Sequence, residues 1–210
     1  MSNVSFPVFF IPFAEFKLDF DFTELQKDDR WIKGTAQREN FGRYDTEMYP
    51  DRYRILDKYP QLSRLILSKF FQYTNEIGID TDFVLTTSWL TKCEKGDTIA
   101  GHAHKNCEFS GILYYDDDYT NQPPLLFSNP ILRCFTTFAP APDSGLTTGY
   151  TNDWNRLPES GLLLFWPSYI AHSMYAKETS KPRRSLAFNF APRGDWGHGD
   201  STMNTSWLSS

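Results

Sequence analysis

The amino-acid sequence predicts a mainly β protein, a sandwich or barrel with helical support. Two observations predict it. From residue 82 onward, short runs rich in β-branched and aromatic residues alternate with clusters of Gly, Pro, Asn and Asp, which is typical of strands joined by turns. Ahead of them, residues 60–78 carry apolar side chains at three- and four-residue spacing, with Pro60 at the start and Gly78 at the end. We therefore expect one amphipathic helix to pack against a β structure.

The segment before that helix carries weaker signals. Residues 6–13, FPVFFIPF, are typical of an edge strand or of an apolar lead-in that docks on the core. Residues 22–34 predict a short helix that ends at Gly34. Residues 35–58 are polar and aromatic without a sustained period, so we expect a loop with a turn of helix at most.

The strand-like runs divide the chain into three parts of a single domain: an N-terminal helical and extended region (1–81), a β core (82–192) and a tail (193–210). Within the core, residues 139–161 form the longest stretch without predicted secondary structure, and a loop of that size often carries function. The runs that we expect to be strands are residues 82–93, 98–104, 108–117, 124–130, 132–138, 161–167, 169–176 and 184–192.

Composition narrows the function classes. The chain of 210 residues has a net charge of −5, which argues against a broad surface for nucleic acid or anionic membrane. No apolar run is long enough to predict a membrane span, and the opening segment lacks the basic start of a signal peptide. Cys93, Cys107 and Cys134 show no CxxC spacing. We expect a protein of the reducing cytoplasm.

The stretch GHAHKNCE (101–108) suggests a metal site, because it holds His102 and His104. On a strand, residues two apart point to the same face, so both imidazoles can chelate one ion. His172, in a later predicted strand, is the candidate third ligand. Glu108 is a ligand, a partner that orients an imidazole, or a solvated charge. Paired histidines on a strand also simply pack or face water, so the metal hypothesis depends on further residues.

Eleven residues after His172, the run RRSLAFNF predicts a strand with two different faces. Arg183, Ser185, Ala187 and Asn189 share one face, and the other face is mostly apolar. We expect the apolar face to bury against the helical layer, which turns the arginine and the serine toward the barrel interior. An inward arginine needs an anion, and its fork of donors fits a carboxylate.

Taken together, these pieces resemble the 2-oxoglutarate- and Fe(II)-dependent oxygenases, which share a double-stranded β-helix core. The matching stretches are SWLTKCEKGDTIAGHAHKNCEFSGILYYDDD, PLLFSNP, GLLLFWPSYIAHSM and RRSLAFNFAP, and they span most of residues 82–192. Within the superfamily, the chain is most similar to a small group common in marine bacteria and their phages, and its spacing is similar to that of prolyl hydroxylases. The resemblance implies a jelly-roll or cupin-like barrel with N-terminal helices packed on one sheet. For a phage-encoded protein, the cytoplasm would be that of the host.

The resemblance also implies the metal and its ligands. His102 takes the first metal position, His104 the second and His172 the third, and the metal is Fe(II). Members of the superfamily usually carry Asp or Glu at the second position, so the histidine at position 104 is a departure. A site of three histidines lacks one negative charge, which should weaken its hold on the metal.

The co-substrate implied by the resemblance is 2-oxoglutarate. Arg183 and Ser185 match the R-x-S pair that anchors its distal carboxylate. Tyr115 falls where many relatives place a tyrosine on the same carboxylate, with Tyr114 as the alternative. The implied reaction is the hydroxylation of a C–H bond in an unidentified small-molecule or peptidyl substrate, in which O2 and 2-oxoglutarate are consumed and succinate and CO2 are released.

A second resemblance is to the cupins. GDTIAGHAHKNCE fits their first motif and GLLLFWPSYIAH fits part of the second, which would make Glu108 a fourth metal ligand. The pattern departs at Tyr115, Tyr169 and Ala176, where cupins carry glycine, glycine and asparagine. This alternative is a metal-dependent dioxygenase or isomerase that does not use 2-oxoglutarate. A further alternative is an inactive barrel that serves as a binding module. The R-x-S pair and the SGILYY stretch favour the oxygenase.

Overall fold

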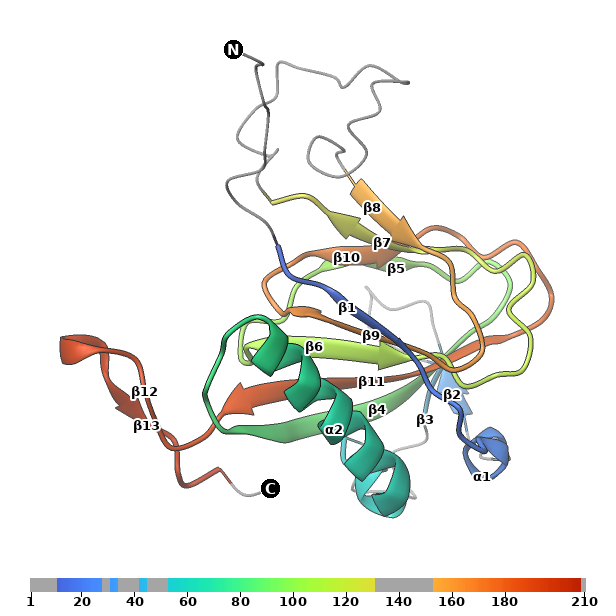
Figure 1. Cartoon of the computed structure of the whole chain (residues 1–210). Coiled ribbons are helices and arrows are strands. Elements are labelled where there is room, and N and C mark those ends of the chain that lie inside the picture. Colours follow the sequence, from blue (N-terminus) through green and yellow to red (C-terminus); the bar gives the residue numbers. More distant parts are fainter. Residues whose placement is uncertain (1–10, 28–30, 34–41, 45–52, 131–152, 209–210) are drawn as a thin grey trace, which may run out of the picture.

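The structure is a computed structural model, and it describes residues 11–27, 31–33, 42–44, 53–130 and 153–208. Figure 1 shows two layers of strands with one long helix across the outside of the larger layer. The helices are α1 (Thr23–Gln26), α2 (Pro60–Glu76) and the 3-10 turns η1 (Ile55–Lys58) and η3 (Gly199–Ser201). The strands are β1 (Ala14–Lys17), β2 (Trp31–Lys33), β3 (Gly42–Tyr44), β4 (Phe83–Cys93), β5 (Ile99–His102), β6 (Phe109–Leu113), β7 (Leu125–Ser128), β8 (Asp153–Arg156), β9 (Leu162–Pro167), β10 (His172–Met174), β11 (Arg183–Pro192), β12 (Asp195–Trp196) and β13 (Met203–Asn204).

Two antiparallel sheets make up the β core. Among the described residues, the major sheet has the strand order β1-β9-β6-β11-β4-β3-β2 and the minor sheet the order β5-β10-β7-β8. From β4 to β11 the chain passes repeatedly from one sheet to the other, which is the connectivity of a double-stranded β-helix. The predicted fold class is therefore confirmed. The apolar core between the sheets includes Ile112, Leu125, Phe127, Leu164 and Trp166.

Strand β11 lies inside the major sheet and presents two different faces, as the sequence predicts. Leu186, Phe188 and Phe190 belong to the outer core, which α2 covers. Arg183 and Asn189 contact side chains on the inner side of the sheet. Alternation along one strand therefore supplies both the apolar support and the polar interior of the barrel.

Helix α2 confirms the predicted helix over residues 60–78 to within two residues at its end. Pro60 occupies the first turn, where its missing N–H costs no helical hydrogen bond. The helix packs on the outer face of the major sheet (Figure 1). There Phe70 stacks on Phe190 with ring centroids 3.8 Å apart. The buried side chains of the helix are Leu62, Ile66, Phe70, Tyr73 and Thr74.

The N-terminal segment agrees with the prediction only in part. Residues 11–13 are not a strand; β1 begins at Ala14 and pairs with β9 at the edge of the major sheet. They are the apolar lead-in given as the alternative, because Ile11 and Phe13 pack against the core between the sheets; residues 6–10 lie outside the described residues. The helix expected over residues 22–34 is too long. Of its described residues, only those of α1 are helical, and β2 is a strand because its backbone pairs with β3, which in turn pairs with β4. Pairing with a distant strand overrides the local helical signal here.

The long loop expected at residues 139–161 contains strand β8, which pairs with β7 in the minor sheet. The preceding part of that loop and the strand expected at 132–138 lie outside the described residues. The tail also carries structure, because β12 and β13 form a hairpin that projects from the end of the barrel (Figure 1, red). The division of the chain at residues 81 and 192 stays a prediction. No helix in the described ranges has the length and apolar character needed to cross a membrane.

Candidate metal centre

Three histidines meet at the end of the minor sheet. His102 ends β5 and His172 begins β10, and the two residues are partners in the antiparallel ladder. His104 follows in the turn after β5. The ring centroids of His102 and His172 lie 4.3 Å apart, and each lies 5.3 Å from that of His104. One candidate ligand atom from each ring lies within 4.8 Å of the other two. The structure thus brings together the three histidines that the sequence singles out.

The hydrogen bonds of the histidines leave one nitrogen of each ring for a metal. Nδ1 of His102 lies 2.8 Å from the carbonyl oxygen of Ala100, and Nδ1 of His172 lies 3.3 Å from that of Ile170. A carbonyl oxygen only accepts, so Nδ1 carries the hydrogen and Nε2 keeps its lone pair. Metal-binding histidines generally donate their other N–H in this way.

The protein environment favours the neutral form of two of the rings. Burial, together with the smaller effect of the neighbouring His102 and His104, lowers the pKa of His172 to about 3. Burial also lowers the pKa of His104. A neutral imidazole is the form that binds a metal. His102 is exposed, so the centre is open to solvent on its side.

Glu108 lies outside this group. The histidines form the cluster of potential metal ligands in the described part of the chain, and Glu108 is not in it. The side chain of Glu108 is exposed, while its backbone is bonded to Phe190 and Ser168. A cupin-type set of three histidines and a glutamate is therefore not formed by the described residues.

Arg183 lies in the barrel interior and is fully buried. Its Nη2 donates to the hydroxyl of Tyr114 at 2.6 Å, and its guanidinium lies 4.9 Å from the centre of that ring. Its Nε and Nη1 have no hydrogen-bond partner among the described residues. A buried guanidinium without a countercharge costs several kcal/mol. Two adjacent nitrogens of a buried cation with unused hydrogens fit a carboxylate ligand.

Ser185 adds a hydroxyl on the same face of β11. Its Oγ lies 2.7 Å from Oγ1 of Thr91, its partner on β4, and both side chains are buried. One of the two hydroxyls donates to the other, so the hydrogen of the second remains for another acceptor. Arg183, Tyr114 and this hydroxyl pair come from three adjacent strands or their ends, and together they fit an anion.

Tyr115 requires a correction. It belongs to the outer core under α2, and its ring lies 5.6 Å from the guanidinium carbon of Arg184. Because side chains alternate along β6 and the residues that follow it, Tyr114 is the tyrosine that turns inward. The assignment of Tyr115 beside Arg183 was therefore wrong by one residue, and the alternative, Tyr114, holds that position.

Three more polar side chains lie near the metal centre, and the sequence predicts no contact between them and the histidines. Ser110 and Asn189 contact His104. The ring of Trp166 lies 5.2 Å from that of His172, and its buried Nε1 has no hydrogen-bond partner within the described ranges. The signal that could have found these residues is their register, since Ser110 lies opposite Asn189 on one side and opposite Trp166 on the other.

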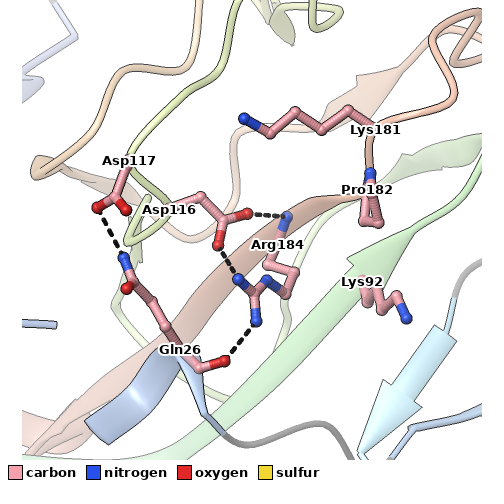
Figure 2. A pocket seen from close by; sticks show the side chains of 7 residues that line it. All are labelled: Gln26, Lys92, Asp116, Asp117, Lys181, Pro182 and Arg184. Carbon is pink, nitrogen blue, oxygen red and sulfur yellow. Dashed lines mark hydrogen bonds and ion pairs between the residues drawn. The ribbon is translucent and has the colours of Figure 1, made fainter. Parts of the chain in front are cut away.

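Two surface cavities of the described structure lie away from the histidines. Figure 2 shows one of about 220 Å³, where Arg184 bridges Asp116 and the backbone carbonyl of Gln26. This arginine is thus already paired, unlike its neighbour Arg183. A second cavity, of about 530 Å³, is lined by residues 117–122 and 157–160. Neither cavity includes a residue of the candidate site, which lies in the barrel interior.

The fold and these side chains define a class: a double-stranded β-helix with a three-histidine metal centre and a buried arginine suited to an organic anion. Comparison with known proteins supports the same class. Residues 87–189 match the family described as "Putative 2OG-Fe(II) oxygenase". This match supports the 2-oxoglutarate/Fe(II) oxygenase superfamily over the β core of the chain. The narrower likeness to a marine bacterial and phage group stays a prediction. No curated protein sequence matches the chain.

Solved structures share the fold at low sequence identity. A prolyl-4-hydroxylase from Pseudomonas putida superposes with a TM-score of 0.57 and 14% identity, over 87% of this chain and 94% of that one. HygX from Streptomyces hygroscopicus, bound to nickel, 2-oxoglutarate and hygromycin B, gives 0.51 and 15%, over 87% and 83%. SnoN, a non-heme alpha-ketoglutarate-dependent epimerase from nogalamycin biosynthesis, gives 0.55 and 11%, over 90% and 79%. These likenesses show the fold.

Proposed function

We propose that the protein is an Fe(II)- and 2-oxoglutarate-dependent oxygenase that hydroxylates a C–H bond of a small-molecule or peptidyl substrate. The observation that carries the proposal is the buried guanidinium of Arg183. Two of its nitrogens, Nε and Nη1, have no hydrogen-bond partner among the described residues, and the end of the same barrel holds three convergent histidines. A bound carboxylate would supply the countercharge that this buried cation lacks among the described residues. The exposed position of Glu108 gives no support to the cupin alternative.

Different residues bind the metal and 2-oxoglutarate in this proposal. His102, His104 and His172 would hold the metal through Nε2. Arg183, Tyr114 and the hydroxyl pair of Ser185 and Thr91 bind the distal carboxylate of 2-oxoglutarate. The chemistry that bound Fe(II) supplies is the activation of O2, while 2-oxoglutarate is converted to succinate and CO2.

Hydroxylation is the reaction proposed because the spacing of the histidines and the R-x-S pair is similar to that of prolyl hydroxylases. The fold is compatible with other outcomes, since an epimerase shares it. The substrate would reach the metal from the open side at His102. A cytoplasmic location, in the host if a phage encodes the protein, is part of the proposal.

The test compares two neighbouring arginines. Under anaerobic conditions, Fe(II) and 2-oxoglutarate should give a weak visible charge-transfer band with the wild type, and O2 should then yield succinate. Arg183→Met should weaken 2-oxoglutarate binding by about 30-fold or more, because it removes charged hydrogen bonds worth at least ~2 kcal/mol.

Arg184→Met is the matched control. Arg184 lies on the opposite face of β11, paired with Asp116, so its loss should leave the band and the affinity for 2-oxoglutarate unchanged. The proposal is wrong if the wild type gives neither the band nor succinate. It is also wrong if the two variants bind 2-oxoglutarate equally well.

A further inference from the structure

Asn189 is the main hydrogen-bond partner of His104. Its Oδ1 lies 2.7 Å from Nδ1 of the imidazole. Asn189 comes from β11, where a bulge in the pairing with β4 follows it, and bulges often re-aim a side chain next to a functional site. In the resulting register, Asn189 lies directly opposite Thr87 on β4 and Ser110 on β6. The contact to the histidine is thus set by the major sheet.

The two ends of the Asn189 amide have separate partners. Nδ2 donates to Oγ1 of Thr87 at 3.0 Å, which turns Oδ1 toward His104. An amide oxygen only accepts, so the hydrogen of the His104 imidazole is on Nδ1. Nε2 then keeps its lone pair, and it is the nitrogen available to the metal.

A chain of donors converges on the same oxygen. The thiol of Cys107 donates to Oγ of Ser168 at 3.2 Å, and Ser168 lies 2.7 Å from Oγ of Ser110. Ser110 in turn donates to Oδ1 of Asn189 at 2.9 Å. Oγ of Ser110 also lies 3.0 Å from Nδ1 of His104. Because the hydrogen of this hydroxyl goes to Asn189, its oxygen accepts from the imidazole, so both contacts favour the hydrogen on Nδ1.

We propose that Asn189 is a positioning residue for the second metal ligand: its side-chain amide fixes the tautomer and the ring orientation of His104. The other two histidines donate to backbone carbonyls, which no substitution removes. His104 occupies the position where relatives usually carry a carboxylate. Asn189 orients the imidazole so that its Nε2 can bind a metal at that position. The inference deepens the proposed function, on which it depends for the identity of the metal.

The test measures metal binding directly, by calorimetric titration of the full chain with Co(II) and by the visible spectrum of the Co(II) complex. Asn189→Leu keeps the shape of the side chain but removes the acceptor, and it should weaken Co(II) binding by about 10- to 100-fold. The Co(II) spectrum should change as well, because the ring of His104 is no longer held. Asn189→Asp keeps the acceptor and adds a charge, so it should bind Co(II) at least as tightly as the wild type.

Two further variants keep the inference testable. Ser88→Ala removes a buried hydroxyl from the same strand as Thr87, where Ser88 accepts from the backbone of Leu56; it should lower stability without changing the Co(II) affinity or spectrum. If Asn189→Leu does not fold, Thr87→Val releases the amide instead, and a several-fold loss of Co(II) affinity is expected. The inference is overturned if the folded Leu variant, or otherwise Thr87→Val, matches the wild type. It is also overturned if Asn189→Asp loses as much affinity as Asn189→Leu.

Failure of this inference is distinct from failure of the proposed function. If the wild type binds Co(II) and converts 2-oxoglutarate with Fe(II), while Asn189→Leu binds Co(II) normally, only the role of Asn189 is wrong. If the wild type binds Co(II) in an Asn189-dependent way but never binds 2-oxoglutarate, the positioning role stands and the oxygenase proposal falls. If the wild type binds no divalent metal, both are wrong.

Discussion

His102 and His172 lie directly opposite each other on the antiparallel strands β5 and β10. The backbone hydrogen bonds of this ladder therefore hold two of the three candidate ligands side by side before any metal arrives. The third, His104, is held from the other sheet by Asn189. A metal bound by all three would join the minor sheet to the major sheet, so metal binding and folding should be linked.

A divalent metal should raise the free energy of unfolding. At a free concentration 100 times the dissociation constant, the expected gain is about 2.7 kcal/mol. Urea unfolding with Co(II) or with EDTA measures it. His172→Ala should lose the gain, whereas His198→Ala, in the exposed tail, should keep it. An equal gain in both variants would show that the metal binds elsewhere.

The adjacent tyrosines should have opposite phenotypes. Tyr114→Phe removes the hydroxyl that contacts Arg183, and a hydrogen bond to a charged group is worth about 1.5–3 kcal/mol. We expect the KM for 2-oxoglutarate to rise about tenfold or more, as measured by succinate release. Tyr115→Phe, on the outer face, should leave this KM within about twofold of the wild type. The reverse order would return the carboxylate contact to Tyr115.

Gly111 should tolerate no side chain without a loss of stability. A Cβ there would lie 2.2 Å from Cε2 of Phe188 and 2.8 Å from the carbonyl oxygen of Leu164. Gly111→Ala should therefore lower the free energy of unfolding by about 1–3 kcal/mol or more. At Gly101 a Cβ would meet nothing within 4 Å, so Gly101→Ala should change it by less than about 0.5 kcal/mol. Urea unfolding in EDTA compares the two without a metal contribution.

Local periodicity was enough to predict most of the fold. Helix α2 and strand β11 each have one apolar face, and both were placed correctly because the pattern of burial is visible in the sequence. The helix expected over residues 22–34 failed for a physical reason. Its second half contains β2, which joins the major sheet by pairing with β3, and β3 pairs with β4. No local pattern encodes pairing with β4, which lies far along the chain.

The site was predictable where chemistry or alternation singled out a residue. The three histidines were found because few residue types bind metals, and Arg183 was found because β11 alternates. The choice between Tyr114 and Tyr115 was not decidable in the same way. Every residue of β6 is buried, so a polar and an apolar face cannot be told apart along it, and strands buried on both sides generally lack this signal. The role of Asn189 depends on the bulge in β11, and no pattern in the sequence predicts that bulge.

The position of β1 has a consequence for how the chain can be shortened. These four residues cover the free edge of β9, with Ala14 opposite Phe165 and Lys17 opposite Leu162. Every residue of β9 is buried. A fragment limited to residues 87–189, which match the oxygenase family, would lack β1. It would expose the apolar edge of β9 with unpaired backbone groups, and such an edge can pair with another copy of the chain. Such a fragment should aggregate, and a soluble fragment of this barrel has to include Ala14–Lys17.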